Sequence, residues 1–278
     1  MFFKPKKYLG QNFLKKTKSQ EIIKEIIKAA NLQKQDTILE IGPGFGILTK
    51  KLAQKAKKVI AVEKDERLTC HLKEVFKNIS NLQIVSGDVL KFKLKNHNLK
   101  SKNYKIVGNI PYSITSPLIR KFLSAKIKPK LMILMVQKEV GERILGKNKE
   151  SFLSNFVKFY GKPEILKNVS RETFWPKPKV DGAILKIDDI QKKYKNIDEK
   201  KFFEFLHLGF SQPRKQIKNN LNKIFQEKTD KVLKKCKIDP QKRPEDLKLD
   251  DWIKIFNKNA QENAKKDAKK NAIESLGY

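Results

Sequence analysis

The chain has 278 residues, of which 39% are hydrophobic, so it can bury a large domain together with a smaller one. It carries 63 Lys and Arg against 30 Asp and Glu, and the net charge of +33 favours a polyanionic partner, either nucleic acid or an anionic membrane surface. The longest hydrophobic run, residues 131–136, is far too short to cross a bilayer, which excludes a membrane-spanning protein of the helical class.

Short apolar runs alternate with helical periodicities through the first two thirds of the chain. Buried strands are predicted at residues 37–41, 58–63, 82–85, 104–107 and 130–136. Helices are predicted at residues 47–56, 66–78, 138–145 and 151–160. This alternation predicts a mostly parallel α/β sheet that binds its ligands at the carboxyl ends of the strands.

Two further helices carry local start signals. Thr17 and Gln20 form the pattern of a capping box before an apolar stripe that runs to Ala30. Ser116 is predicted to cap a later helix, with Pro117 at the favoured first position.

Two last strands, at residues 164–169 and 180–187, have no helix between them and should close the sheet as an antiparallel edge. Residues 188–196 are polar and resemble a linker, and from residue 197 the pattern is helical only. We therefore predict a sheet domain over residues 1–190 that begins with a basic N-terminal arm, and a small all-helical domain over residues 197–278. Its last twenty or so residues form a basic tail, either a solvated helix or a frayed end.

A glycine turn follows the first predicted strand, with Gly42, Gly44 and Gly46 at alternate positions. A dinucleotide-binding turn would need glycine at the next position, which is Ile47, so the pattern argues against NAD or FAD. Gly42 and Gly44 instead leave room for an amino-acid tail against the backbone. A glycine triplet alone is equally compatible with a turn that has no ligand.

Acidic residues end the next two strands. Glu63 can accept hydrogen bonds from both hydroxyls of a ribose, and Asp88 can accept one from an adenine amino group. Each is also compatible with a solvated acid at a strand end. Their placement with the glycine turn along one crevice favours a nucleoside cofactor, in the arrangement of Rossmann-like methyltransferases that use S-adenosylmethionine.

The string Asn109-Ile110-Pro111-Tyr112 follows the fourth strand in the same crevice. If the Asn109 side-chain oxygen and the Ile110 carbonyl accept the N–H bonds of an aromatic amine, its lone pair becomes available for methylation. Tyr112 would stack on the base, which must be single-stranded or flipped out. Phe174 is a candidate for the opposite wall, although its spacing slightly favours simple packing.

These motifs resemble the small-subunit ribosomal RNA adenine dimethyltransferases (the KsgA family) over nearly the whole chain. The resemblance is carried, in the order of that family, by residues 9–14, 40–46, 62–63, 87–89, 109–112, 174–181, 209–215 and 238–245. It implies contacts with S-adenosylmethionine at Asn12, Leu14, Gly42, Glu63, Asp88 and Asn109. Together with Gly44 of the glycine turn and Val89 after Asp88, these residues form the predicted cofactor set. The resemblance also implies target-adenine contacts at Asn109, Tyr112 and Phe174, and N6,N6-dimethyladenosine at two adjacent adenosines near the 3′ end of 16S rRNA as the product.

Two places depart from the pattern of that family. Pro213 occupies a position that is usually basic, which weakens one expected contact with the rRNA backbone. Residues 147–155 lack the Tyr-Gly that often precedes Leu-Ser. Neither place belongs to the predicted reaction site.

Two basic clusters are candidates for RNA binding. One consists of Lys91, Lys93, Lys95, Lys100, Lys102 and Lys105, and the other of Arg214, Lys215, Lys218 and Lys223. Either cluster is also compatible with an ordinary solvated face, the first more than the second. Only six of the 63 basic residues are Arg, and a compositional bias toward Lys would give the same total charge without any role in nucleic-acid binding.

The expected partners are small-subunit rRNA and the immature small ribosomal subunit, bound by a cytoplasmic monomer without metal. Neither the two Cys nor the three His have the spacing of a metal site. Two alternatives remain: a large-subunit rRNA adenine methyltransferase that confers antibiotic resistance, and a non-catalytic assembly or transcription factor. The strings 212–215 and 238–245 favour the small-subunit enzyme, and intact Glu63, Asp88 and Asn109 favour catalysis.

Overall fold

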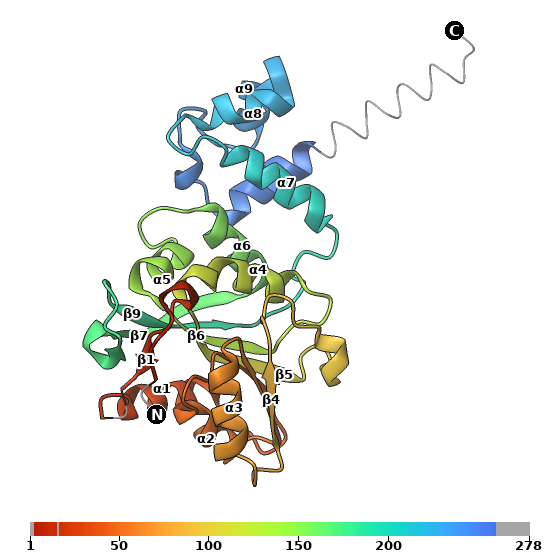
Figure 1. Cartoon of the computed structure of the whole chain (residues 1–278). Coiled ribbons are helices and arrows are strands. Elements are labelled where there is room, and N and C mark those ends of the chain that lie inside the picture. Colours follow the sequence, from red (N-terminus) through yellow and green to blue (C-terminus); the bar gives the residue numbers. More distant parts are fainter. Residues whose placement is uncertain (1–2, 16, 260–278) are drawn as a thin grey trace. The chain divides into compact units, whose positions relative to one another are not determined.

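The computed structural model describes residues 3–15 and 17–259 of the chain (Figure 1). These residues divide into two compact units. The first runs to Leu145 and resumes over Tyr160–Lys192, and the second comprises Gly146–Phe159 and the chain from Lys193 onward. The segment before Tyr160 thus belongs to the second unit, whereas the sequence pattern placed it in the sheet domain.

A seven-stranded sheet forms the centre of the first unit. Its spatial order is β4–β3–β2–β5–β6–β9–β7. The strands are β2 (Thr37–Ile41), β3 (Lys58–Glu63), β4 (Leu82–Ser86), β5 (Tyr104–Asn109), β6 (Leu131–Gln137), β7 (Lys162–Val169) and β9 (Gly182–Asp188). The first five in spatial order are parallel, and β9 runs antiparallel to both neighbours. The predicted Rossmann-like sheet with an antiparallel edge is confirmed.

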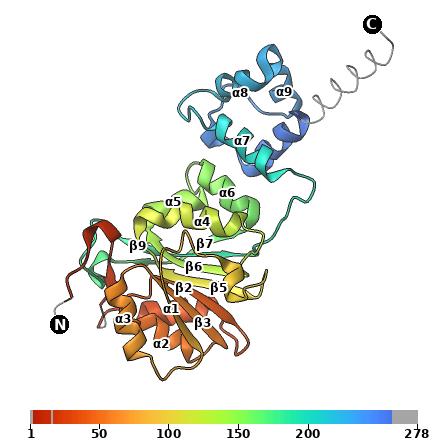
Figure 2. The same cartoon turned by 45° about the vertical axis from the view of Figure 1, so that its right-hand side comes forward.

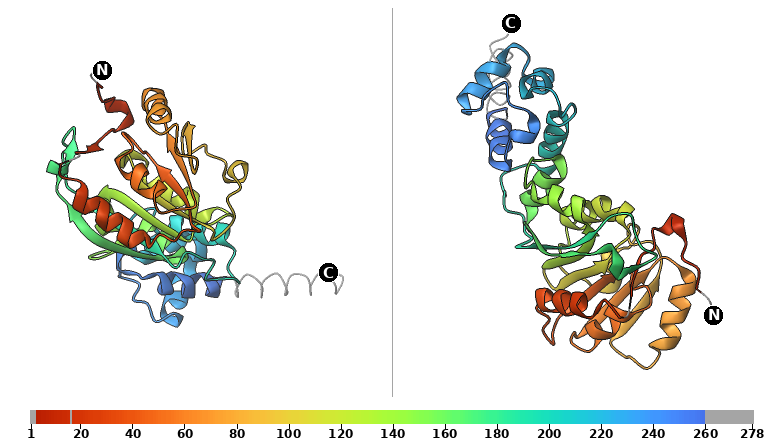
Figure 3. Two further views of the ribbon diagram at one scale, coloured as in Figure 1. Left: turned by 90° about the horizontal axis from the view of Figure 1, so that it is seen from below. Right: turned by 90° about the vertical axis from the view of Figure 1, so that its left-hand side faces the viewer.

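Helices cover both faces of this sheet (Figures 2 and 3). They are α1 (Gln20–Ala30), α2 (Ile47–Ala53), α3 (Glu66–Val75), α4 (Thr115–Ser124) and α5 (Lys138–Leu145). Alternate strand residues such as Ile38, Val107 and Ile133 form a core with Ile26 and Leu52 of the helices α1 and α2. Because successive side chains of a strand point to opposite faces, the remaining strand residues pack against the helices on the other face of the sheet.

Both predicted helix starts are wrong in detail. Helix α1 begins at Gln20 with Ser19 at the N-cap, where no side chain forms a capping hydrogen bond, so the predicted Thr17 capping box does not form. Helix α4 begins at Thr115 because the short 3-10 turn η3 (Tyr112–Ile114) leads directly into it. Pro117 therefore lies inside the first turn, where its missing N–H costs no hydrogen bond.

The N-terminal arm is more regular than its composition suggests. It contains a 3-10 turn, η1 (Lys7–Leu9), and a two-residue strand, β1 (Phe13–Leu14). This strand pairs antiparallel with β8 (Phe174–Trp175) in a small second sheet. So short a strand has no periodicity, and its partner strand begins 160 residues after Leu14, at Phe174, so sequence patterns could not reveal the pairing.

In the described part of the second unit, the regular elements are helical and include no strand. They are α6 (Phe152–Tyr160), α7 (Glu199–Gly209), α8 (Ile217–Phe225), α9 (Thr229–Lys235) and a last helix over residues 249–259. Phe156 and Phe159 of α6 pack on Phe203 and Phe202 of α7, with ring centroids 4.6 and 5.1 Å apart. The remaining 3-10 turns of the chain are η2 (Leu94–His97), η4 (Arg171–Thr173), η5 (Gln226–Lys228) and η6 (Pro244–Asp246). The predicted basic tail, residues 260–278, lies outside the described residues.

Candidate active site

One pocket lies at the carboxyl ends of β2, β3, β4 and β5, in the first unit. Parallel strands bring these ends to one edge of the sheet, and the N-terminal arm contributes the remaining wall. Of the predicted site residues, the pocket is lined by Asn12, Leu14, Gly42, Gly44, Glu63, Asp88, Val89, Asn109 and Tyr112. The predicted cofactor and base residues therefore share a single cavity, and Phe174 alone is not among its lining residues.

The glycine turn gives the pocket a floor of bare backbone. Gly44 has a φ of 59°, in the left-handed region that favours glycine. Its N–H donates to Oε2 of Glu63 at 3.2 Å, which joins the turn after β2 to the end of β3. Gly46, with a φ of 78°, lies so close to α3 that an added Cβ would stand 2.4 Å from the ring of Phe76.

Glu63 ends β3 with its carboxylate turned inward, and the residue is 7% exposed. Burial raises the pKa of Glu63, while backbone N–H groups, including those of Asp65 and Gly44, act in the opposite direction. The Asp65 N–H donates to Oε1 at 2.9 Å. Each carboxylate oxygen thus has one amide donor that fixes it and a second lone pair that can accept from a ligand hydroxyl.

Asp88 follows β4, and two neighbouring groups hold its carboxylate at the pocket wall. The Leu90 N–H donates to its Oδ1 at 2.8 Å, and Lys64 Nζ lies 2.9 Å from its Oδ2. The Lys64 hydrogen bond is the main cause that lowers the pKa of Asp88, so this group is a carboxylate at neutral pH. An ionised acceptor suits an amino group as donor.

Asn109 ends β5, and its side-chain amide is fixed from the N-terminal arm. Its Nδ2 donates to the backbone oxygen of Asn12 at 2.9 Å. Since this bond uses the NH₂ end of the amide, the Oδ1 end remains an acceptor, and no described residue donates to it. Ile110 is the next residue of the chain and also lines the pocket.

Tyr112 presents a ring at the pocket wall and hides its hydroxyl. The hydroxyl oxygen is buried and has no hydrogen-bond partner among the described residues. Burial raises the pKa of Tyr112 to about 12, and the charge of Asp181 contributes. The side chain is therefore neutral at physiological pH and offers a flat apolar surface.

Phe174 lies elsewhere. Its ring is 0% exposed and belongs to the core cluster that contains Leu14, Val169 and Ile184. The β1–β8 pairing sets Phe174 opposite Leu14, and the next residue, Trp175, is turned outward. The stacking role predicted for Phe174 is not supported by this position, because pairing with β1 turns its ring into the core.

Sequence reasoning gave no role to Glu40 or to most of the arm, although Glu40 and residues 8–11 also line the pocket. Glu40 is buried in β2, and burial raises its pKa to about 8, with the charge of Glu63 adding to the effect. An acidic residue inside an apolar strand is the signal that could have identified it.

The two clusters of basic residues predicted to bind RNA differ in how many of their side chains are exposed. Lys105 is 4% exposed, and its Nζ contacts the carbonyls of Ala30 and Asn31 and the carboxylate of Asp36, so its predicted RNA contact is wrong. Its inclusion reflected spacing alone, which does not reveal that β5 points this side chain inward. The remaining lysines of the first cluster are exposed. In the second cluster Arg214, Lys215 and Lys223 are exposed and Lys218 is half-buried.

Neither a metal cluster nor a bilayer-crossing helix is found in residues 3–15 and 17–259. No group of three or more His, Cys, Asp or Glu residues there could hold a metal ion. None of the helices in these ranges is long and apolar enough to cross a membrane.

Comparison with known proteins identifies the family to which this chain is similar. Residues 2–261 match the family model described as ribosomal RNA adenine dimethylase. The ribosomal RNA small subunit methyltransferase A of Mycoplasma capricolum is 40% identical over 263 residues, covering 91% of this chain and 97% of the relative. That of Fusobacterium nucleatum is 39% identical, with 92% and 98% covered. The crystal structure of a dimethyladenosine transferase from Plasmodium falciparum superposes with a TM-score of 0.73 at 30% identity, covering 89% of this chain and 98% of that one.

Proposed function

The chain belongs to the ribosomal RNA adenine dimethylase family, and from this premise we propose that it transfers methyl groups from S-adenosylmethionine to N6 of two adjacent adenosines near the 3′ end of 16S rRNA. The product is N6,N6-dimethyladenosine, made during ribosome biogenesis. The observation that carries the proposal is the single pocket lined by Glu63, Asp88, Asn109 and Tyr112.

The residues of the pocket fit S-adenosylmethionine, which supplies an electrophilic methyl group on sulfur. The second lone pairs of Glu63 accept the ribose hydroxyls, and Asp88 accepts the adenine amino group. The bare backbone at Gly42 and Gly44 leaves room for the amino-acid tail. A second set, Asn12, Leu14 and Val89, encloses the cofactor from the arm and from the loop after β4.

The target adenosine enters beside Asn109 and Tyr112. Asn109 Oδ1 and the Ile110 carbonyl accept the two N–H bonds of the exocyclic amine, which pushes its nitrogen toward tetrahedral geometry and frees its lone pair. Tyr112 stacks on the base, which must leave its helix to reach the pocket. No strong general base is required, because the methylated nitrogen is acidic enough to lose its proton to water.

The physiological substrate is the immature small subunit, and the protein acts on it in the cytoplasm as a monomer that uses no metal. Relatives that are 39% and 40% identical over more than 90% of this chain carry small-subunit names, so the large-subunit alternative is not favoured. The pocket keeps Glu63, Asp88 and Asn109 together, which also argues against a non-catalytic factor.

Mass spectrometry of rRNA from cells that lack the gene tests this function. We expect N6,N6-dimethyladenosine to disappear from 16S rRNA and to return when the wild-type gene is restored. A restored gene that carries Asn109→Ala should leave it absent. An unchanged 16S rRNA, or a methyl group lost from 23S rRNA instead, would reject the proposal.

A further inference from the structure

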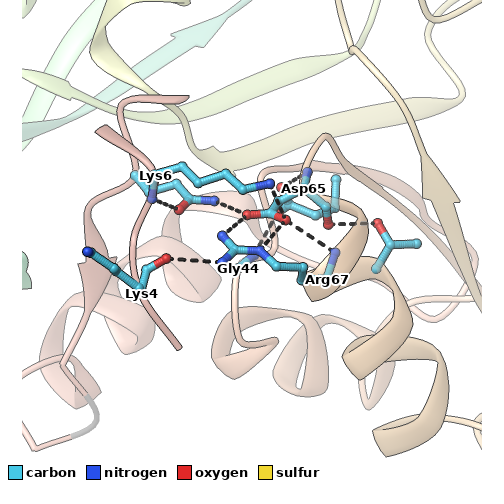
Figure 4. Close-up of polar contacts among 8 residues, drawn as sticks. Lys4, Lys6, Gly44, Asp65 and Arg67 are labelled. Atoms are coloured by element: carbon cyan, nitrogen blue, oxygen red, sulfur yellow. Dashed lines mark hydrogen bonds and ion pairs between the residues drawn. The ribbon is translucent and has the colours of Figure 1, made fainter. Parts of the chain in front are cut away.

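One buried carboxylate gathers the contacts of the N-terminal arm, defined here as residues 3–14. Asp65 lies two residues after Glu63 and forms the N-cap of α3, and its side chain is 0% exposed. It accepts hydrogen bonds from Arg67 Nε at 3.0 Å and Nη2 at 2.7 Å (Figure 4). From the arm it accepts Gln11 Nε2 at 2.8 Å, and Lys6 Nζ lies 3.4 Å away.

The same partners tie the rest of the arm to α3. Gln11 Oε1 accepts the backbone N–H of Lys6 at 2.7 Å, which closes a loop around the 3-10 turn η1. Arg67 Nη1 donates to the Lys4 carbonyl at 3.2 Å (Figure 4). The Arg67 guanidinium also stands 4.5 Å from the ring centroid of Phe3. Arg67 and Gln11 thus hold the arm at both of its ends, and both are bound to Asp65.

Asp65 is connected to the Asn109 side chain through the arm. Gln11 precedes Asn12, and the Asn12 carbonyl is the acceptor that fixes the Asn109 amide. On its other side, the Asp65 N–H holds Oε1 of Glu63. Asp65 itself is not among the residues that line the pocket, so it acts through others.

We propose that Asp65 is a positioning residue for methyl transfer, and this inference rests on the proposed function. Through Gln11 it keeps the arm in place, so that the Asn12 carbonyl holds the Asn109 amide with Oδ1 toward the base. An arm released from Asp65 lets this amide rotate. The NH₂ end would then face the amino group of the adenine, and two donors cannot pair.

Asp65 is ionised, which strengthens its hydrogen bonds to the arm and to Arg67. Hydrogen bonds from Arg67 are the main cause that holds the pKa of Asp65 well below its usual range. The group is therefore a carboxylate at neutral pH. Replacing Gln11 breaks its hydrogen bond to Asp65 and its bond to the Lys6 N–H within the arm. It leaves the Asp65–Arg67 pair in place, and because Gln11 also lines the pocket, methyl transfer is measured at saturating cofactor.

Gln11→Ala is compared with Gln33→Ala, a matched change at an exposed glutamine that bonds Asn31. Three quantities are measured on the full chain: amide hydrogen exchange of residues 3–14, the ¹⁵N–¹H resonance of the Asn109 side chain, and single-turnover methyl transfer to undermethylated small subunits at saturating S-adenosylmethionine. We expect Gln11→Ala to speed exchange in the arm, to shift the Asn109 resonance and to slow transfer by roughly 10- to 100-fold. Gln33→Ala should match the wild type in all three, and Asp65→Asn should follow Gln11→Ala.

A merely structural anchor would weaken cofactor binding or lower the melting temperature but leave the rate at saturating cofactor unchanged. A wild-type rate or an unmoved Asn109 resonance in Gln11→Ala would overturn the inference. If the wild-type protein itself fails to methylate small subunits, the proposed function fails instead. The exchange and resonance measurements still decide whether Asp65 anchors the arm onto Asn109.

Discussion

In the proposed mechanism, some side chains of the pocket act by hydrogen bonding and others by their shape. Tyr112 belongs to the second kind, because its hydroxyl is buried without a partner among the described residues. A buried polar atom without a hydrogen bond costs free energy, so removing it should do no harm. We expect Tyr112→Phe to keep methyl transfer within about threefold of the wild type, since the stacking surface is unchanged.

Tyr112→Ala removes the aromatic ring itself and is the counterpart of Tyr112→Phe. Base stacking contributes about 1–3 kcal/mol per base, so kcat/KM should fall by roughly 10- to 100-fold. Steady-state transfer to small subunits measures both variants. A Tyr112→Phe variant as inactive as Tyr112→Ala would mean that the hydroxyl, and not the ring, carries the function.

Glu40 makes stability depend on pH. Its pKa is about 8 in the folded chain against an ordinary value of 4.5. Between these values the unfolded chain loses a proton that the folded chain keeps, so the folded state loses stability as the pH rises, by at most about tenfold in the folding constant per pH unit. Below pH 4.5 both states are protonated, and above pH 8 neither is.

Glu40→Gln cannot titrate. We therefore expect its stability relative to the wild type to rise as the pH goes from 4.5 to 8 and to level off outside this range. Urea unfolding at several pH values measures the difference. Glu74→Gln, the same substitution at an exposed position on α3, serves as the control. A difference between Glu40→Gln and the wild type that stays constant with pH would contradict the burial of a proton at Glu40.

The sequence predicted which residues share the pocket better than it predicted the orientation of single side chains. Glu63, Asp88 and Asn109 end parallel strands, and the geometry of a parallel sheet brings such ends together whatever the rest of the chain does. Phe174 and Lys105 were placed wrongly because pairing of β1 with β8 and the inward face of β5 decide where they point. Asp65 was overlooked because its partners, Gln11 and Arg67, come from different parts of the chain.

At the scale of elements, the contact of β2 with β5 fixes the position of Asn109. Gly108 lies opposite Ile41, and an added Cβ would stand 2.6 Å from the Ile41 carbonyl oxygen. That oxygen belongs to the backbone of a central strand and cannot move aside. We expect Gly108→Ala to destabilise the fold by about 1–3 kcal/mol and to weaken methyl transfer further by displacing Asn109.

Gly141→Ala in α5 is the control, since its added Cβ would meet the flexible end of Ile165 at 3.3 Å and alanine favours a helix. Urea unfolding should show a clearly smaller loss for this variant. Equal stabilities of the two variants would mean that the β2–β5 contact tolerates a side chain.

The elements that the sequence predicted well are those whose pattern is local. The five parallel strands are short apolar runs between helices, and their positions agree with the structure to within two residues at each end. The start of α1 was misplaced because Thr17 has the residue types of a capping box without its hydrogen bonds. Residues 146–159 were predicted in the sheet domain but belong to the second unit. Phe156 and Phe159 pack on α7, and the spacing of residues along the sequence does not predict such contacts.

For the molecule as a whole, the net charge of +33 predicts RNA binding that depends steeply on salt. Charge reversal of Lys91, Lys93 and Lys95, or of Arg214, Lys215 and Lys223, should weaken binding of small-subunit rRNA without changing the affinity for S-adenosylmethionine. Each lost phosphate contact should reduce the slope of log K against log salt by about 0.7–0.9. Filter binding at several salt concentrations measures this slope.

The control is the same charge change at Lys50, Lys51 and Lys55, which are exposed at the end of α2 and just after it. Equal losses for all three triple variants would show that total charge, and not the two clusters, governs binding.

Transfer of a labelled methyl group by the purified protein, offered small and large subunits from cells that lack the modification, tests the central claim most directly. We expect label in 16S rRNA as N6,N6-dimethyladenosine at two adjacent adenosines, no label in 23S rRNA, and none with Asn109→Ala. Label in 23S rRNA only, or undiminished label with Asn109→Ala, would contradict it.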